Sequence, residues 1–128
     1  MGEGQLDIDD PDLVAAIEAL TAKEIDLLPF GSIRLDAHGI VTLYSARERD
    51  QSGYRGAAIG QHFFAEMAPC MNTPAFRGRL DAARKARRLD IRFDHVSDLP
   101  SGERDVPLMV RLVSASDGGV WILLQRDD

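Results

Sequence analysis

Three apolar runs near the end of the chain constrain the fold most strongly. The run "LDIRFDHV" (89–96) alternates with a period of two, which is typical of a half-buried strand. The residues at its alternate positions are Leu89, Ile91, Phe93 and His95. The runs "VPLMVRLVSA" (106–115) and "VWILLQR" (120–126) are also rich in β-forming residues, and the turn sequence "SDGG" separates them. We therefore predict three consecutive strands.

Two more strands are predicted near the start of the chain. In "FGSIRLDAHGIVTLY" (30–44), Ile33 and Leu35 alternate with polar residues before "DAHG", and Gly39 supplies the positive φ that such a turn needs. Helical segments separate the second strand from the third, so strands and helices segregate along the chain. This order indicates the α+β class, with a five-stranded antiparallel sheet. Helices on one face of that sheet would leave a cavity beneath them.

The first helical segment is "DPDLVAAIEALTAKEIDLL" (10–28). Asp10 is a suitable N-cap and Pro11 suits the first helical position. Leu13, Ile17 and Leu20 form an apolar stripe, which either packs on the outer face of the sheet or pairs between two chains.

The remaining helices fall between the two groups of strands. The polar segment "SARERDQSGYRGAAIGQH" (45–62) predicts short helical turns joined by loops, and "FFAEM" (63–67) predicts a further turn. The longest predicted helix is "NTPAFRGRLDAARKARRL" (72–89), with Asn72 or Thr73 as its cap and Pro74 in its first turn.

Composition limits the classes of partner. A chain of 128 residues, 45% apolar, fits one domain with one core. Its net charge of -6 argues against a broad nucleic-acid or membrane surface, because both partners are anionic. The basic residues Arg84, Lys85, Arg87 and Arg88 are interpreted as the solvated end of a helix. No secretory signal and no apolar run of about 20 residues is present, which predicts a cytoplasmic protein.

Cys70 is the only cysteine and closes the apolar segment "FFAEMAPC". A lone thiol is inert packing, a nucleophile, a redox sensor or an attachment point. A Cys/His enzyme would need a base such as His62, but no third orienting residue is identifiable, so we predict no enzyme. The three histidines have no metal-ligand spacing, so no metal site is predicted. From the residues alone, packing is the favoured interpretation of Cys70.

Tyr44, Glu48 and Ser52 recur at intervals of four. If their segment is helical, the three side chains share one face and form a line of hydrogen-bonding groups. Glu48 can donate a hydrogen bond only if it is protonated, which requires burial. From spacing alone, an exposed charged turn is the favoured alternative.

These motifs together resemble the photoactive yellow protein family of PAS-type blue-light receptors. The resemblance rests on "FGSIRLDAHG", on Tyr44 with Glu48 and Ser52, on "IGQHFFAEMAPC", on "TPAFRGRL" and on "VWILLQR". It covers Pro29 to the end of the chain, with a weaker match before it. It implies a PAS fold with an N-terminal cap (1–28) and a photosensor core (29–128).

The resemblance also implies a covalent chromophore, p-coumaric (4-hydroxycinnamic) acid, held as a thioester on Cys70. By the same resemblance, Tyr44 and Glu48 donate hydrogen bonds to its phenolate oxygen. Ser52 replaces a threonine whose hydroxyl bonds the tyrosine. The positions that match the lining of the pocket are Ile33, Tyr54, Phe63, Met67 and Ala68.

The function implied by the resemblance is that of a blue-light photoreceptor signalling domain. Light would isomerise the chromophore from trans to cis, and Glu48 would lose its proton. Partial unfolding, with release of the N-terminal cap, would be the output. The alternative is a PAS sensory or interaction module that binds another ligand or a protein partner. The chromophore is the only partner that the resemblance names; the downstream signalling protein is unknown, and a homodimer is possible.

Two positions depart from the family pattern. Tyr54, followed by Arg55, stands where the type member has an arginine that shields the pocket. The region of Ser101 and Gly102 aligns with a methionine that assists dark recovery. We therefore expect slow recovery, or a pH-dependent mixture of protonated and ionised dark forms.

Overall fold

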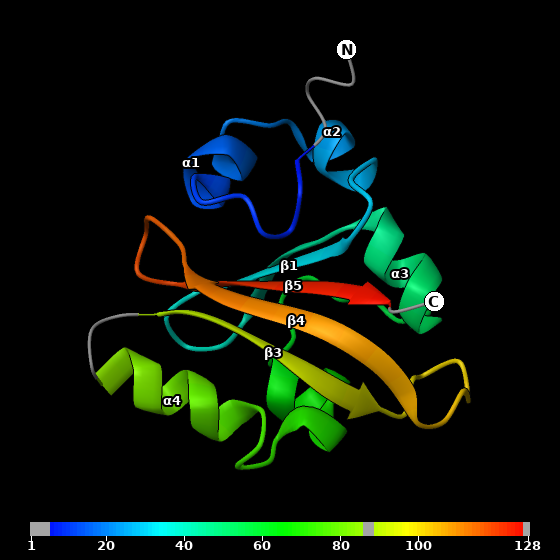
Figure 1. The fold of residues 1–128 in the computed structure, drawn as a ribbon. Coiled ribbons are helices and arrows are strands. Elements are labelled where there is room, and N and C mark those ends of the chain that lie inside the picture. The colour runs from blue at the N-terminus through cyan, green and yellow to red at the C-terminus, as the bar shows by residue number, and fades with distance from the viewer. Residues whose placement is uncertain (1–5, 86–88, 127–128) are drawn as a thin grey trace.

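A five-stranded antiparallel sheet forms the centre of the computed structural model, which describes residues 6–85 and 89–126, without the side chains of Cys70, Ala83 and Arg84 (Figure 1). The strands are β1 (Gly31–Leu35), β2 (Val41–Tyr44), β3 (Asp90–Ser97), β4 (Val106–Ser114) and β5 (Val120–Arg126). Their order across the sheet is β2-β1-β5-β4-β3, so the first and last strands are neighbours. The predicted fold class and all five predicted strands are confirmed.

Tight turns set the register of two hairpins, β1–β2 and β4–β5. Between β1 and β2, the Asp36 backbone N–H donates to the Ile40 carbonyl oxygen over 2.9 Å, and Gly39 takes a φ of +84°. Between β4 and β5, Gly119 lies so close to β1 that an added Cβ would overlap the carbonyl oxygen of Leu35. Only glycine fits there without moving the backbone.

The two faces of the sheet support separate apolar clusters, because side chains alternate along each strand. On β5, Val120, Ile122 and Leu124 belong to one cluster. Trp121 and Leu123, between them, belong to the other. Helices cover each face, so the helices that follow β2 and the N-terminal helices lie on opposite sides of the sheet.

The N-terminal segment covers one face with two short helices, α1 (Leu13–Glu18) and α2 (Ala22–Asp26), where one continuous helical segment was expected. The predicted cap was also wrong, because α1 begins after Asp12 and lacks a side-chain cap. Thr21 is the N-cap of α2 and forms a capping box with Glu24. The apolar stripe packs on the sheet, which is the first of the two expected arrangements.

Polar contacts fix this N-terminal layer to the sheet. The indole Nε1 of Trp121 donates to Glu18 Oε2 over 2.9 Å, and the Arg34 guanidinium lies 5.1 Å from the centre of the Trp121 ring. The buried Arg111 guanidinium donates to the carbonyl oxygens of Ile8 and Asp10 at 3.0 and 2.7 Å. The segment that precedes α1 is thereby held to β4. The division at residue 28 into cap and core stays a prediction.

The opposite face carries α3 (Ala46–Ser52), the π-helical turn η1 (Phe63–Met67), the 3₁₀ turn η2 (Pro69–Met71) and α4 (Arg77–Lys85). Helix α4 begins later than predicted, at Arg77. The Thr73 hydroxyl has no hydrogen-bond partner among the described residues, and it is the Thr73 carbonyl oxygen that accepts from Phe76 and Gly78. Of the predicted basic stretch, Lys85 is exposed at the end of α4, and Arg87 and Arg88 lie outside the described residues.

Within the described ranges, no helix has both the length and the apolar character required to cross a bilayer.

A pair of glycine substitutions tests the packing of the sheet. Gly119→Ala should lower the free energy of unfolding by about 2 kcal/mol, because its Cβ would displace backbone of β1. Gly78→Ala, on α4, meets only ordinary contacts beyond 3.5 Å and should raise it by about 0.5–1 kcal/mol. Urea unfolding followed by tryptophan fluorescence measures both, and equal effects of the two substitutions would contradict the close approach at Gly119.

Candidate functional site

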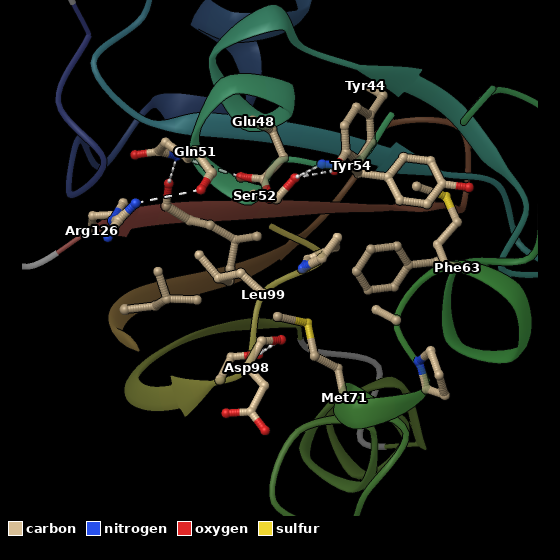
Figure 2. Close-up of a pocket in the computed structure, with 17 residues that line it drawn as sticks. Tyr44, Glu48, Gln51, Ser52, Tyr54, Phe63, Met71, Asp98, Leu99 and Arg126 are labelled. Atoms are coloured by element: carbon tan, nitrogen blue, oxygen red, sulfur yellow. Dashed lines mark hydrogen bonds between the residues drawn. The ribbon is translucent and has the colours of Figure 1, made fainter. Parts of the chain in front are cut away.

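A cavity of about 280 Å³ lies between the sheet and the helical elements that follow β2 (Figure 2). Its lining combines an apolar wall with a few polar groups that come from different elements. The lining residues are Tyr44, Glu48, Gln51, Ser52, Tyr54, Phe63, Met67, Ala68, Pro69, Met71, Ser97, Asp98, Leu99, Pro100, Leu108, Leu124 and Arg126. Mostly apolar pockets with a few placed polar groups are typical of small-molecule sites.

Helix α3 supplies the polar end of the cavity, and Ser45 fixes its position. The Ser45 hydroxyl accepts from the Glu48 backbone N–H over 3.2 Å, which caps the helix. The same hydroxyl accepts from Ser32 N–H over 3.0 Å, and Ser45 N–H donates to the Ser32 carbonyl oxygen over 2.9 Å. The first turn of α3 is therefore bonded directly to β1.

The sequence Ser45-Ala-Arg-Glu48 fits a capping box, but the structure completes only half of it. In a full box the Glu48 carboxyl group would bond the Ser45 N–H, which here donates to β1 instead. The Glu48 side chain is turned toward the sheet and the cavity (Figure 2). Ser45 therefore marks the start of α3, and the Glu48 carboxyl group is not needed for the cap and faces the cavity.

Glu48 is 6% exposed and is packed against the backbone of Gly31. A Cβ on Gly31 would collide with Glu48 Oε1, so the glycine makes room for the carboxyl group. Burial raises the pKa of Glu48 to about 8, against an ordinary value of 4.5, and the hydrogen bond from Gln51 Nε2 (3.5 Å) opposes that rise. At neutral pH Glu48 is mainly a carboxylic acid, and it can donate a hydrogen bond into the cavity.

Tyr44 and Ser52 provide a second polar pair beside Glu48. The Tyr44 hydroxyl lies 3.0 Å from Ser52 Oγ, which also accepts from the Tyr54 backbone N–H over 3.2 Å. Burial raises the pKa of the Tyr44 phenol, and the nearby Glu48 raises it further, so the phenol stays protonated. The structure therefore brings Tyr44, Glu48 and Ser52 together in one lining.

The four-residue spacing predicted that the three side chains share a helix face, and this was wrong for Tyr44. Tyr44 is the last residue of β2 rather than a residue of α3, so the three side chains do not share a helix face. The Tyr44 phenol instead extends from the end of β2 to Ser52, the last residue of α3. Arg49 supports it from the outside, with its guanidinium 5.5 Å from the ring centre and donating to the carbonyl oxygens of Tyr54 and Gly56.

The π-helical turn η1 forms the apolar wall. Phe63 and Met67 line the cavity and are buried. His62 caps the turn reciprocally with Glu66: its Nδ1 accepts from Ala65 N–H over 3.1 Å, and its own N–H donates to Glu66 Oε1 over 2.6 Å. His62 is absent from the cavity lining, and its hydrogen bonds give it a structural role in η1.

Cys70 lies in η2, between Pro69 and Met71, which both line the cavity. The described part of the structure includes its backbone but not its side chain. The chain therefore passes the cavity at Cys70, and its role as the attachment point stays a prediction.

The predicted lining residues divide into two groups. Tyr54, Phe63, Met67 and Ala68 line the cavity. Ile33 does not: it is 1% exposed and lies in the apolar cluster that underlies this face of the sheet. Its position on β1 puts it in the core rather than at the cavity surface.

Sequence reasoning missed the opposite wall, which consists of residues 97–100, Leu108, Leu124 and Arg126, and it missed Gln51, Pro69 and Met71. Gln51 could have been found, because it lies three residues after Glu48 on the same helix. The loop after β3 has no such signal. It is held over the site by Ser101 N–H, which donates to the Ser52 carbonyl oxygen over 2.9 Å, and by Glu103, which receives Arg126 at 2.8 and 3.2 Å.

The two positions that depart from the family pattern lie at or next to the cavity. The ring of Tyr54 lies 6.0 Å from that of Tyr44 and lines the cavity, whereas Arg55 is exposed and does not. Ser101 is an exposed loop residue next to the lining residue Pro100. Among the side chains that the structure describes, no group of three or more His, Asp or Glu residues is arranged to hold a metal ion.

The chain resembles proteins of known class in sequence and in structure. It is 31% identical over 116 residues to photoactive yellow protein from Rhodothalassium salexigens, which covers 90% of this chain and 92% of the relative. The photoactive yellow protein domain of the sensor histidine kinase Ppr from Rhodospirillum centenum superposes with a TM-score of 0.79 and 34% identity, over 87% of this chain and 97% of that domain.

A third similarity concerns the fold alone. The PAS domain of the quorum-sensing receptor RpfR from Cronobacter turicensis, solved in complex with BDSF, has a TM-score of 0.60 at 14% identity, over 78% of this chain and 95% of that one. No family model matches the chain.

The buried carboxyl group should make the stability of the ligand-free protein depend on pH. The folded-state pKa of Glu48 lies above its unfolded value, so between pH 4.5 and about 8 the folded state holds a proton that the unfolded state has lost. The free energy of unfolding should therefore fall as pH rises through this window, with a slope of up to about 1.4 kcal/mol per pH unit, and this contribution should level off above it.

Glu48→Gln removes that titration, so the variant should lose this slope. Urea unfolding of both proteins across the window isolates the Glu48 contribution as the difference between them, since other titrating groups such as His95 are common to both. Parallel pH profiles would show that Glu48 is ionised in the folded protein.

Proposed function

Because the chain belongs to the photoactive yellow protein family and has the PAS fold, we propose that it is a blue-light photoreceptor domain that carries p-coumaric acid as a thioester on Cys70. The observation that supports this most directly is the protonated Glu48 beside the Tyr44–Ser52 pair at the polar end of an otherwise apolar cavity. Two neutral donors that converge in a buried site suit an anionic oxygen on an apolar ligand.

The residues of the site fit the proposed group. Phe63, Met67 and Leu108 provide an apolar lining suited to an aromatic ring. Glu48 and Tyr44 provide donors that would favour a charged phenolate oxygen, since hydrogen bonds to an ionised acceptor are short and strong. The Cys70 backbone runs past the apolar wall, next to Pro69. The acyl end of the p-coumaroyl group would lie at Cys70, and its phenolate end would lie at Glu48 and Tyr44.

When bound, the p-coumaroyl group would supply absorption of blue light and a double bond that isomerises from trans to cis. The residues of the chain would do the rest. Tyr44 and Glu48 would orient the ring by donating from their hydroxyl and carboxyl groups. Ser52 would hold the Tyr44 hydroxyl in place, and the walls from η1 and the 97–100 loop would exclude water.

Glu48 would hold its proton in the dark and release it after illumination. The resulting carboxylate would be buried, with a single long hydrogen bond from a described residue, that of Gln51. An under-compensated buried charge is costly, and that cost would favour partial opening of the domain. The N-terminal helices are the proposed mobile element, since they pack on the far side of the strands that line the cavity.

The alternative function is a PAS sensory module that binds another small molecule without a covalent bond. Arg126 in the lining favours this reading, because a guanidinium at an apolar cavity suits a carboxylate ligand, which would share it with Glu103. The signalling partner and a homodimer remain proposals under either function.

Reconstitution separates the two functions. Incubation of the protein with p-coumaric anhydride should add one p-coumaroyl group, detected by intact mass, and should produce absorption in the visible. Cys70→Ser should gain neither. Failure of the parent chain to gain both would overturn the covalent photoreceptor, and retention of a small acid without a gain in covalent mass would support the alternative.

The role of Glu48 predicts a colour change. Glu48→Gln keeps a donor but replaces an acid with a weaker amide, so negative charge on the phenolate should spread further along the conjugated system and move the absorption to longer wavelength. The variant should also lack the infrared change that marks loss of a carboxylic acid proton after illumination. An unchanged spectrum would remove Glu48 from the contact with the chromophore, and Asp50→Asn, an exposed change on the same helix, serves as control.

A further inference from the structure

Gln51 is the only described residue whose side chain donates a hydrogen bond to the Glu48 carboxyl group. Its side-chain Nε2 lies 3.5 Å from Glu48 Oε1 and 3.3 Å from the carbonyl oxygen of Leu124 on β5. Both acceptors are satisfied by one NH₂ group, which has two hydrogens. The amide of Gln51 therefore bridges the buried acid to the central strand of the sheet (Figure 2).

The surroundings hold this bridge in one orientation. A Cβ on Gly31 would approach Gln51 Nε2 to 3.0 Å, so the amide packs over the same glycine that makes room for Glu48. The backbone of the same turn is also held. Arg126 donates to the Gln51 carbonyl oxygen over 3.5 Å, and the Ser101 N–H donates to the Ser52 carbonyl oxygen. Residues 51 and 52 are thus attached to β5 and to the loop after β3.

The direction of the bridge determines where the acid proton sits. Nε2 faces two oxygen acceptors, so it acts as a donor, and Glu48 Oε1 must accept. A carboxylic acid has one carbonyl oxygen and one hydroxyl oxygen, and the carbonyl oxygen is the stronger acceptor. An amide N–H that bonds Oε1 therefore favours Oε1 as the carbonyl oxygen and Oε2 as the donor atom of the protonated side chain.

We propose that Gln51 is a positioning residue for the Glu48 proton: its amide ties Oε1 to β5, leaves the proton on Oε2, and remains as a donor to the carboxylate once that proton has left. The inference rests on the proposed function only in its last clause, the departure of the proton after illumination. The position of the proton before illumination follows from contacts of the chain itself.

The same hydrogen bond acts unequally on the two forms of Glu48. Hydrogen bonds to an ionised acceptor are roughly twice as strong as those between neutral groups, so the amide stabilises the carboxylate more than the acid. Gln51 therefore limits the cost of the buried charge, and it should prolong the deprotonated form. Loss of the amide should make Glu48 bind its proton about tenfold more tightly, which is a shift of about one pH unit.

The first test uses the ligand-free protein and the infrared C=O band of the protonated carboxyl group, assigned as the band that Glu48→Gln lacks. In Gln51→Met, which keeps the length of the side chain but not the amide, this band should move to higher frequency. Its pH midpoint should rise by about one unit. Asp50→Asn, an exposed neighbour, should change neither. An unchanged band and midpoint in Gln51→Met would overturn the proposal.

A second variant guards against misfolding. Gln51→Asn keeps an amide but shortens it by one methylene, so it should not reach Oε1 and should shift the band as the methionine does. A purely structural contribution of Gln51 would change the free energy of unfolding without moving the carboxyl band, and that result would also contradict the proposal.

The second test uses the protein after reconstitution. Gln51→Met should return from the deprotonated, light-induced form about tenfold faster than the parent chain, because the carboxylate lacks its donor. A lifetime equal to that of the parent would overturn the last clause of the proposal. If no chromophore attaches to the parent chain while the band still shifts in the ligand-free variants, the proposed function fails and the assignment of the Glu48 proton stands.

Discussion

Burial of the Glu48 carboxyl group is the constraint on which the rest of this site depends. The acid lies against β1, and burial holds its pKa near 8 rather than 4.5. That position requires Gly31 on the strand, because any side chain there would occupy the place of Oε1. It also requires the Ser45 cap, which anchors the first turn of α3 to β1 through Ser32. A glycine, two serines and a glutamate thus form a single structural unit.

This unit is attached to β1, which is an inner strand of the sheet. Strand β1 lies between β2 and β5, so the first and last parts of the chain meet beneath the acid. On β5, Leu124 lines the cavity while its neighbour Leu123 packs in the N-terminal cluster. A shift of this strand caused by charge at Glu48 would be felt on both faces, because the two faces share one backbone.

Period-two alternation predicted β1 and β3, because burial on one face of a sheet produces that pattern, and runs of β-forming residues predicted β4 and β5. The turn at Gly39 predicted the return strand β2. The helices were less predictable. The predicted helical segment 10–28 forms two short helices, because the Thr21 hydroxyl accepts from the Glu24 N–H and starts α2 as a separate helix. Pro74 likewise precedes α4, whose first described helical residue is Arg77.

Within the site, the limits of sequence reasoning follow from the origin of each wall. Glu48, Ser52 and Tyr44 are close in sequence, so their grouping could be anticipated even though Tyr44 belongs to a strand. Leu99 and Arg126 are separated from them by dozens of residues, and they reach the cavity only through the turn between β3 and β4 and the end of β5. Ile33 was placed at the site by resemblance, and in the ligand-free structure it is buried in the core cluster beneath the cavity.

The contact of Trp121 with Glu18 and Arg34 gives the molecule an internal optical probe. Trp121 is the only tryptophan in the chain, and its indole is sandwiched between the sheet and the N-terminal helices. Indole emission responds to the polarity and charge around the ring, so departure of α1 would alter it at once. Opening on the far side of the sheet from the cavity can therefore be followed in real time without attaching a label.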